Sequence, residues 1–139
     1  MTYIPANLRL EVTERAGNCC EYCLRSQSDV VFKFHIEHII AEKHGGQTVT
    51  GNLALSCSVC NTYKGTDIAS ADPQTGLATF LYHPRKQNWS DHFYLQNAIT
   101  EPLTAEARVT VFLLRFNDER RVEERKALIR LKRYPCQKE

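Results

Sequence analysis

Four of the six cysteines form two pairs whose spacing suits the binding of one metal ion. The pairs are Cys20-Glu21-Tyr22-Cys23 and Cys57-Ser58-Val59-Cys60. A Cys-x-x-Cys turn presents two thiolates to an ion, and two such turns complete the tetrahedral shell that Zn²⁺ prefers. Because four cysteines leave no open position, the sequence predicts a structural zinc ion rather than a catalytic one. A thiol-disulfide enzyme is the weaker interpretation, since it needs an unmetallated, reactive pair.

The other two cysteines have less certain roles. Cys19 adjoins Cys20 and is an alternative zinc ligand, although the spacing favours Cys20. We expect Cys136 to be an unligated thiol. The 33 residues between Cys23 and Cys57 exceed the roughly 15–20 of a simple zinc ribbon, so a sizeable segment is inserted between the pairs.

That inserted segment holds side chains suited to hydrolysis. Glu37 and His38 are adjacent at the end of an apolar stretch, and Asn61 follows the second cysteine pair. Carboxylate and amide oxygens suit Mg²⁺ or Mn²⁺, and an imidazole can deprotonate a water near neutral pH. His35 lies two residues before Glu37, so on a strand both point to one face. It is either a further metal or phosphate contact or an exposed strand residue.

Several short motifs occur in a characteristic order. They are the run Glu37-His38-Ile39-Ile40, the pair Gly45-Gly46, then Asn52-Leu53, and finally Cys57-x-x-Cys60-Asn61-x-x-Lys64-Gly65. Asn52 follows His38 by 14 residues, and Asn61 follows Asn52 by nine. From Cys20 to about Thr66 the chain resembles the HNH endonuclease family, whose fold is the ββα-metal finger. The segments 72–76, 83–85 and 89–93 more weakly resemble small stand-alone bacterial HNH proteins.

The resemblance implies a role for each matching residue. His38 corresponds to the general base that activates the attacking water. Glu37 and Asn61 correspond to ligands of a catalytic divalent metal, Mg²⁺ or Mn²⁺. Asn52 corresponds to the central asparagine that fixes the loop and orients the histidine, and Lys64 stands where a basic residue contacts a phosphate. Glu37 itself departs from the aspartate that many members carry.

The helices and strands expected around these residues indicate an α+β fold. It is a zinc-stabilised ββα-metal (HNH) finger with a flanking N-terminal helix and C-terminal strands and helices. The helices are expected over 5–17, 57–64, 105–116 and 117 to about 133, and the strands over 30–40, 53–56, 77–82 and 93–96. In the apolar run before His38, Phe32, Phe34 and Ile36 alternate with polar residues, which is strand periodicity. We expect one domain over residues 1–139, with an HNH core at about 19–66 and an extension at about 67–139.

Composition agrees with a folded, cytoplasmic protein. The chain has 139 residues, 42% of them hydrophobic and 24% charged, with no apolar stretch long enough to span a membrane and no secretory signal pattern. Net charge is only +2, but residues 115–139 hold nine Lys or Arg against five Asp or Glu. Arg85, Lys86 and this basic region are therefore candidate phosphate contacts. Those in the last helix are Arg120, Arg121, Arg125, Arg130, Lys132 and Arg133.

These observations predict a metal-dependent endonuclease acting on DNA, with RNA an open alternative partner. One finger cuts one strand, so a homodimer would be needed to cut both. The main rival is a non-catalytic, zinc-stabilised nucleic-acid-binding module, in which Glu37 and His38 are relics. A zinc-scaffolded protein-interaction module is a second rival, which predicts no salt-dependent binding to DNA. The target and the biological role are open.

Overall fold

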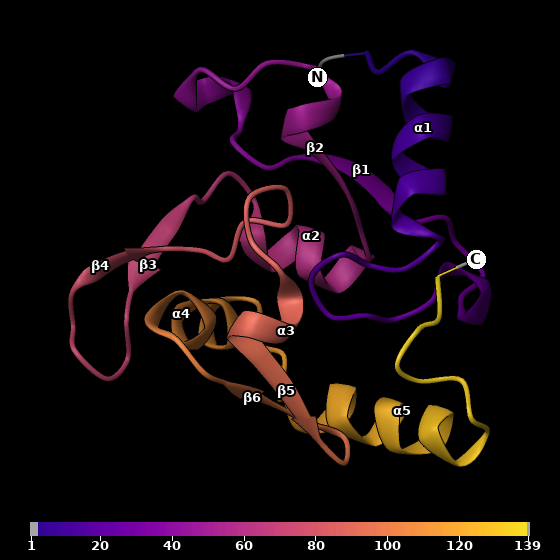
Figure 1. The fold of residues 1–139 in the computed structure, drawn as a ribbon, viewed down its shortest axis with the longest axis vertical. Helices are drawn as coiled ribbons and strands as arrows, with labels where there is room; N and C mark the ends of the chain where they lie inside the picture. Colours follow the sequence, from indigo (N-terminus) through magenta and orange to yellow (C-terminus); the bar gives the residue numbers. More distant parts are fainter. Residues whose placement is uncertain (1–2, 139) are drawn as a thin grey trace.

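The computed structural model describes residues 3–138 and has an α+β fold. Its strands pair into two-stranded antiparallel sheets, with helices packed among them (Figure 1). The elements are α1 (Ala6–Ala16), β1 (His35–His38), β2 (Leu53–Ser56), α2 (Ser58–Lys64), β3 (Ala69–Ala71), β4 (Ala78–Phe80), α3 (Trp89–His92), β5 (Phe93–Gln96), β6 (Ile99–Pro102), α4 (Ala105–Leu113) and α5 (Glu119–Arg130). No helix in the described part of the chain is both long and apolar enough to cross a bilayer.

The first half of the chain forms a hairpin followed by a helix. β1 and β2 are antiparallel, and His38 lies opposite Leu53. α2 begins two residues after β2 and ends at Gly65. All four residues of β2 are buried, and α1 packs against this strand. The predictions of a strand over Leu53–Ser56 and of a helix ended by Gly65 are therefore confirmed.

α1 lies close to its predicted boundaries. It begins after Pro5 and ends before Gly17, whose φ of 60° is the left-handed conformation that terminates many helices. Its buried residues are Val12 and Ala16, one turn apart, so a single face of the helix is buried.

The strand predicted over residues 30–40 is shorter and differs in which side chains it buries. Only His35–His38 pairs as β1, while Phe32 is 81% exposed and the Glu37 side chain is buried. The segment before β1 does not continue the strand, because the backbone N–H of Phe34 donates to Oε1 of Gln27, at 2.7 Å. Within β1 the carboxylate, rather than an apolar residue, therefore faces the interior.

The second half of the chain adds two hairpins and two long helices. β3 pairs with β4, and β5 pairs with β6. The Asp72 carboxylate, just after β3, accepts hydrogen bonds from Arg108 at 3.0 and 2.8 Å. These bonds tie the β3–β4 hairpin to α4. β5 matches the predicted strand, whereas the sequence pattern does not indicate β3 or β6. β3 carries no β-branched or aromatic residue, and β6, although it begins with Ile99 and Thr100, ends at Pro102, which interrupts a strand pattern.

α4 begins as predicted but ends early. The Thr104 hydroxyl caps its N-terminus, but the helix stops at Leu113 rather than at Phe116. Arg115 has a φ of 53°, which turns the chain and returns Phe116 to the core. Phe112, one residue before the end of the helix, is 63% exposed.

The segment after α5 returns to the first cysteine pair. The Tyr134 hydroxyl donates to the Cys23 carbonyl at 2.6 Å, and the Cys136 N–H donates to the Leu24 carbonyl at 2.8 Å. A disulfide joins Cys19 to Cys136, whose Cα atoms are 5.7 Å apart. The expectation of an unligated thiol at Cys136 is wrong, because the fold brings together cysteines 117 positions apart.

One cluster of buried apolar side chains draws on both halves of the chain. It includes residues of α1, of the β1–β2 hairpin, of α2 and of α4. Across the two halves, the Trp89 indole donates to the Tyr22 carbonyl at 2.8 Å. The two halves of the chain therefore pack together through apolar contacts as well as through the C-terminal segment.

Candidate metal centre and active site

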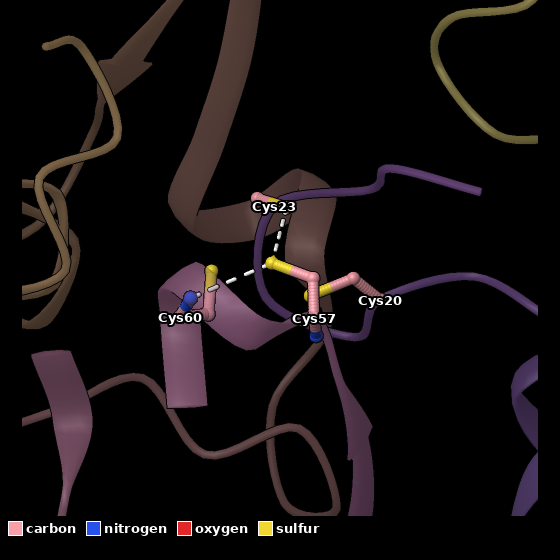
Figure 2. Close-up of side chains that lie close together, drawn as sticks. All are labelled: Cys20, Cys23, Cys57 and Cys60. Carbon is pink, nitrogen blue, oxygen red and sulfur yellow. Dashed lines mark hydrogen bonds between the residues drawn. The ribbon is translucent and has the colours of Figure 1, made fainter. Parts of the chain in front are cut away.

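Four cysteines converge between the first loop and the start of α2. The ligand sulfurs of Cys20, Cys23, Cys57 and Cys60 all lie within 4.8 Å of one another, and every one of these residues is buried (Figure 2). A tetrahedron with zinc–sulfur bonds of about 2.3 Å has edges of about 3.8 Å. The Sγ atoms of Cys23 and Cys57 are 3.7 Å apart, which fits that geometry. The cluster supports a structural zinc ion, and Cys19 is excluded as a ligand by its disulfide.

Four buried cysteine sulfurs in one cluster are a donor set that suits Zn²⁺. Burial raises the pKa of Cys20 and Cys60, whereas hydrogen bonds from the other cysteines lower the pKa of Cys23. Zn²⁺ binds cysteines as thiolates and displaces their protons, so binding of the metal depends on pH.

His38 ends β1 with its imidazole half-buried. Its Nε2 lies 2.9 Å from the Thr48 hydroxyl oxygen. Its backbone carbonyl and that of Ile39 both accept hydrogen bonds from Lys64 Nζ, at 3.3 and 2.9 Å. The histidine is thus fixed through its ring by the following loop and through its backbone by α2.

Asn52 closes the loop that follows His38. Its side-chain Oδ1 accepts a hydrogen bond from the Ile40 N–H, and its Nδ2 donates to the carbonyls of Ile40 and Gln47, each at 2.9 Å. Its own carbonyl accepts from the Ile39 N–H at 2.8 Å. These contacts agree with the expected role of Asn52 as a residue that fixes the loop rather than one that reacts.

Gly46 lies in this loop and packs against the backbone of Ile40, two residues after the end of β1. A Cβ atom there would lie 1.7 Å from the Ile40 carbonyl oxygen. Any other residue at position 46 would therefore force the backbone to shift. We expect Gly46→Ala to lower the free energy of unfolding by more than about 2 kcal/mol. Gly51→Ala is the matched control, since a Cβ there meets nothing within 4 Å, and its effect should stay within about 0.5 kcal/mol. Chemical denaturation of both variants measures the difference, and equal stabilities would contradict the crossing.

Glu37 lies in a buried polar network, and its carboxylate is not open to solvent. One oxygen accepts a hydrogen bond from the Tyr22 hydroxyl, and the other lies 3.1 Å from Lys64 Nζ. Burial raises the pKa of this carboxyl, more than Lys64 and Tyr22 lower it. Since both oxygens have partners, the structure does not present Glu37 as a free metal ligand. The expectation that Lys64 contacts a phosphate is wrong, because its side chain is 2% exposed.

The same network makes a prediction about stability. Lys64→Met removes the cation and leaves the Glu37 carboxylate buried without its charge partner. Removing one member of a buried ion pair costs about 3–5 kcal/mol, so we expect a loss of that size in unfolding free energy. Lys43→Met, at an exposed lysine of the loop, should change it by less than about 0.5 kcal/mol. Similar losses in the two variants would argue against the network.

Asn61 offers the hard oxygen that Glu37 does not. It lies three residues before Lys64 on α2, so the two side chains occupy neighbouring positions on the helix surface. α2 packs against β1, and Lys64 reaches the end of that strand. Within residues 3–138, the half-buried Asn61 side chain makes no hydrogen bond.

The remaining predicted phosphate contacts differ in exposure. Arg85 is half-buried and paired with Glu21 of the first cysteine turn. Lys86 is exposed and lines a largely apolar cavity of about 600 Å³ beside the end of β1. His35 is exposed, with Nε2 3.5 Å from the Ser58 hydroxyl. Lys86 and His35 are therefore accessible, whereas Arg85 is held by its partner.

The structure also corrects the basic surface predicted on the last helix. Arg121 and Arg125 are buried, at 9% and 4% exposure, whereas Arg120 is exposed. Charged residues on an amphipathic helix look alike in sequence, so no signal separated the buried arginines from the exposed one. The sequence pattern also does not indicate Tyr22, which hydrogen-bonds to Glu37, or Thr48, which hydrogen-bonds to His38. Tyr22 carried a weak signal, since it lies between two ligand cysteines.

A β-hairpin and a helix that share a four-cysteine centre, with a histidine at the end of the first strand, define a zinc-stabilised ββα finger. Residues 20–67 match the family model described as HNH endonuclease. The family resemblance is thereby confirmed for this part of the chain. No curated protein and no solved structure matches the chain in the comparisons made.

Proposed function

We propose that this protein is an endonuclease that hydrolyses phosphodiester bonds of DNA in a metal-dependent reaction. The observation that carries the proposal is the placement of His38 at the end of β1, within the segment that matches the HNH endonuclease family. Lys64 holds its backbone carbonyl and Asn52 holds the backbone of Ile40 two residues later, while its ring stays half-exposed. Such a fixed, accessible imidazole suits a general base.

His38 supplies the proton acceptor in this proposal. When Thr48 accepts a hydrogen bond from Nε2–H, the lone pair of the imidazole is on Nδ1. That nitrogen takes a proton from water, and the resulting hydroxide attacks phosphorus in line with the leaving oxygen. The bond from phosphorus to that oxygen then breaks, and the oxygen takes up a proton from solvent. Lys64 and Asn52 fix the backbone at His38 and at Ile40, and Thr48 holds the ring itself.

The predicted ligands fit a catalytic Mg²⁺ or Mn²⁺ only in part. Glu37 would have to leave Lys64 and Tyr22 to bind it, whereas the Asn61 amide oxygen is free among the described contacts. Mg²⁺ commonly needs few protein ligands when it arrives with a substrate phosphate. Such an ion would neutralise charge that develops on the phosphate oxygens. We assign no step to Glu37.

Exposed cations suit the backbone of a nucleic acid. Lys86 lies near the end of β1, and Arg120, Lys126 and Arg130 are exposed on α5. Contacts of this kind carry little sequence information, and binding that depends on them weakens as salt rises. DNA is the proposed partner, and a cytoplasmic location is part of the same proposal.

The test is cleavage of supercoiled plasmid by the purified zinc-loaded protein with Mg²⁺ or Mn²⁺, beside samples without added cation or with EDTA. Nicking or linearisation that requires the added cation supports the endonuclease. The rival, a zinc-stabilised nucleic-acid-binding module, is favoured by the engaged Glu37 carboxylate. It predicts salt-sensitive DNA binding without any cleavage. Absence of both cleavage and binding would contradict both functions.

A further inference from the structure

We infer that Arg121 of α5 is the charge partner of the zinc centre and helps the finger to retain its metal. Its Nη2 lies 3.3 Å from the Cys60 sulfur and 3.9 Å from the Cys57 sulfur. This arginine comes from the C-terminal extension, more than 60 positions after both cysteines. The metal centre therefore includes a contact from outside residues 20–67, the segment that matches the family model.

The charge of the centre explains why a cation belongs there. A Zn²⁺ ion with four thiolates carries a net charge of −2, and all four cysteines are buried. A buried net charge is costly unless it is paired and hydrogen-bonded. The Arg121 guanidinium supplies a positive charge together with N–H donors that point at the sulfurs. Such contacts around the ligands tune how strongly a metal is held.

The guanidinium is also fixed in orientation. Its Nη1 donates to the Leu114 carbonyl at 2.7 Å and to the Arg115 carbonyl at 3.4 Å. Its Cζ lies 5.6 Å from the centre of the Phe116 ring. These contacts come from the turn after α4, so the packing of α4 and α5 sets the position of the charge. Arg121 is a positioning residue for the metal centre and does not contact substrate.

Arg125 provides a matched control. It lies one turn further along α5 and is more deeply buried than Arg121. Its Nε donates to the Ala98 carbonyl at 2.7 Å, and its Nη2 donates to Asn117 at 3.1 Å. Among the described contacts it makes no hydrogen bond to a cysteine sulfur. Its charge is within electrostatic range of Cys23 and Cys60, so replacing it removes a buried positive charge of α5 without removing a hydrogen bond to the zinc ligands.

The experiment measures zinc affinity by competition with a chromogenic chelator for wild type, Arg121→Met, Arg121→Lys and Arg125→Met. Loss of a group that supports metal ligands weakens affinity by about 10–100-fold, and we expect that loss in Arg121→Met. Arg121→Lys should lie between it and wild type, and Arg125→Met, which removes a more distant charge but no hydrogen bond to a ligand sulfur, should lose far less affinity than Arg121→Met. The Co²⁺-substituted proteins give a second readout, because the sulfur-to-cobalt absorption band should shift only in the Arg121 variants.

Two results would overturn the inference. One is a zinc affinity of Arg121→Met within twofold of wild type. The other is an equal loss in Arg121→Met and Arg125→Met, which would show general destabilisation. If Arg121→Met does not fold, Arg121→Lys is compared with Arg125→Lys instead. Weaker zinc binding confined to Arg121→Lys supports the inference, and equal affinities contradict it.

Discussion

Replacing His38 by alanine is expected to reduce plasmid cleavage by about 10²–10⁴-fold, the usual contribution of a general base. The loss should appear in the cleavage rate while zinc content and the thermal midpoint stay close to those of wild type. The reason is structural: the groups that hold this strand end bind the backbone at residues 38–40, and alanine keeps that backbone. Single-turnover cleavage of a labelled duplex gives the rate of the chemical step.

His44→Ala is the control for this experiment. His44 is exposed in the loop after β1, and its side chain makes no hydrogen bond within residues 3–138. This variant should cut like wild type. Cleavage that persists in His38→Ala would show that another group, or a contaminating nuclease, does the chemistry. Cleavage lost equally in both variants would point to damage of the loop rather than to loss of the base.

Removing the zinc should have the largest effect on folding. Cys60→Ser replaces a buried ligand, and structural zinc sites contribute about 10 kcal/mol or more of apparent binding free energy to folding. We therefore expect residues 20–67 to lose their cooperative structure, with zinc content falling from one ion per chain toward zero. Acidification should release the metal too, because protons compete for thiolates and burial already raises the pKa of Cys20 and Cys60.

Cys136→Ser separates this effect from the general loss of a cysteine. It breaks the disulfide to Cys19 but leaves the four ligands in place, so its zinc content should equal that of wild type. Circular dichroism and thermal unfolding, read beside metal analysis, distinguish the two variants. A Cys60→Ser protein that keeps its zinc and its thermal midpoint would contradict the assignment of the centre.

Much of the finger could be predicted because its signals are local. The spacing of Cys57 and Cys60, followed by Gly65, indicates a short helix, and α2 ends where that glycine stands. Asn52 likewise hydrogen-bonds to Ile40, at the start of its own loop. That loop is so tight at position 46 that only glycine fits there. Turns, caps and short hairpins are set by neighbouring residues, so the sequence alone carries enough information for them.

The failures concern partners that are distant in sequence. A glutamate in an apolar strand is expected on the exposed face, but Glu37 is buried because Lys64, 27 positions later, supplies its counter-charge. Arg121 is buried for the same kind of reason, since its partners include cysteines of α2. Nothing in the local pattern of Cys136 indicates Cys19. In each case tertiary packing decides whether the side chain is buried and which partner it meets. The periodicity of apolar residues in the sequence does not carry that information.

The link between Cys19 and Cys136 also changes what a protease can do to this protein. The two cysteines are 117 positions apart, so the bond makes a covalent ring that contains the whole finger and α5. One cut anywhere inside that ring, for instance in the exposed stretch around Phe32, leaves a single molecule of unchanged mass apart from one added water. Fragments separate only after a reductant opens the ring or after a second cut, so nicked and intact chains differ in mass chiefly on reducing gels.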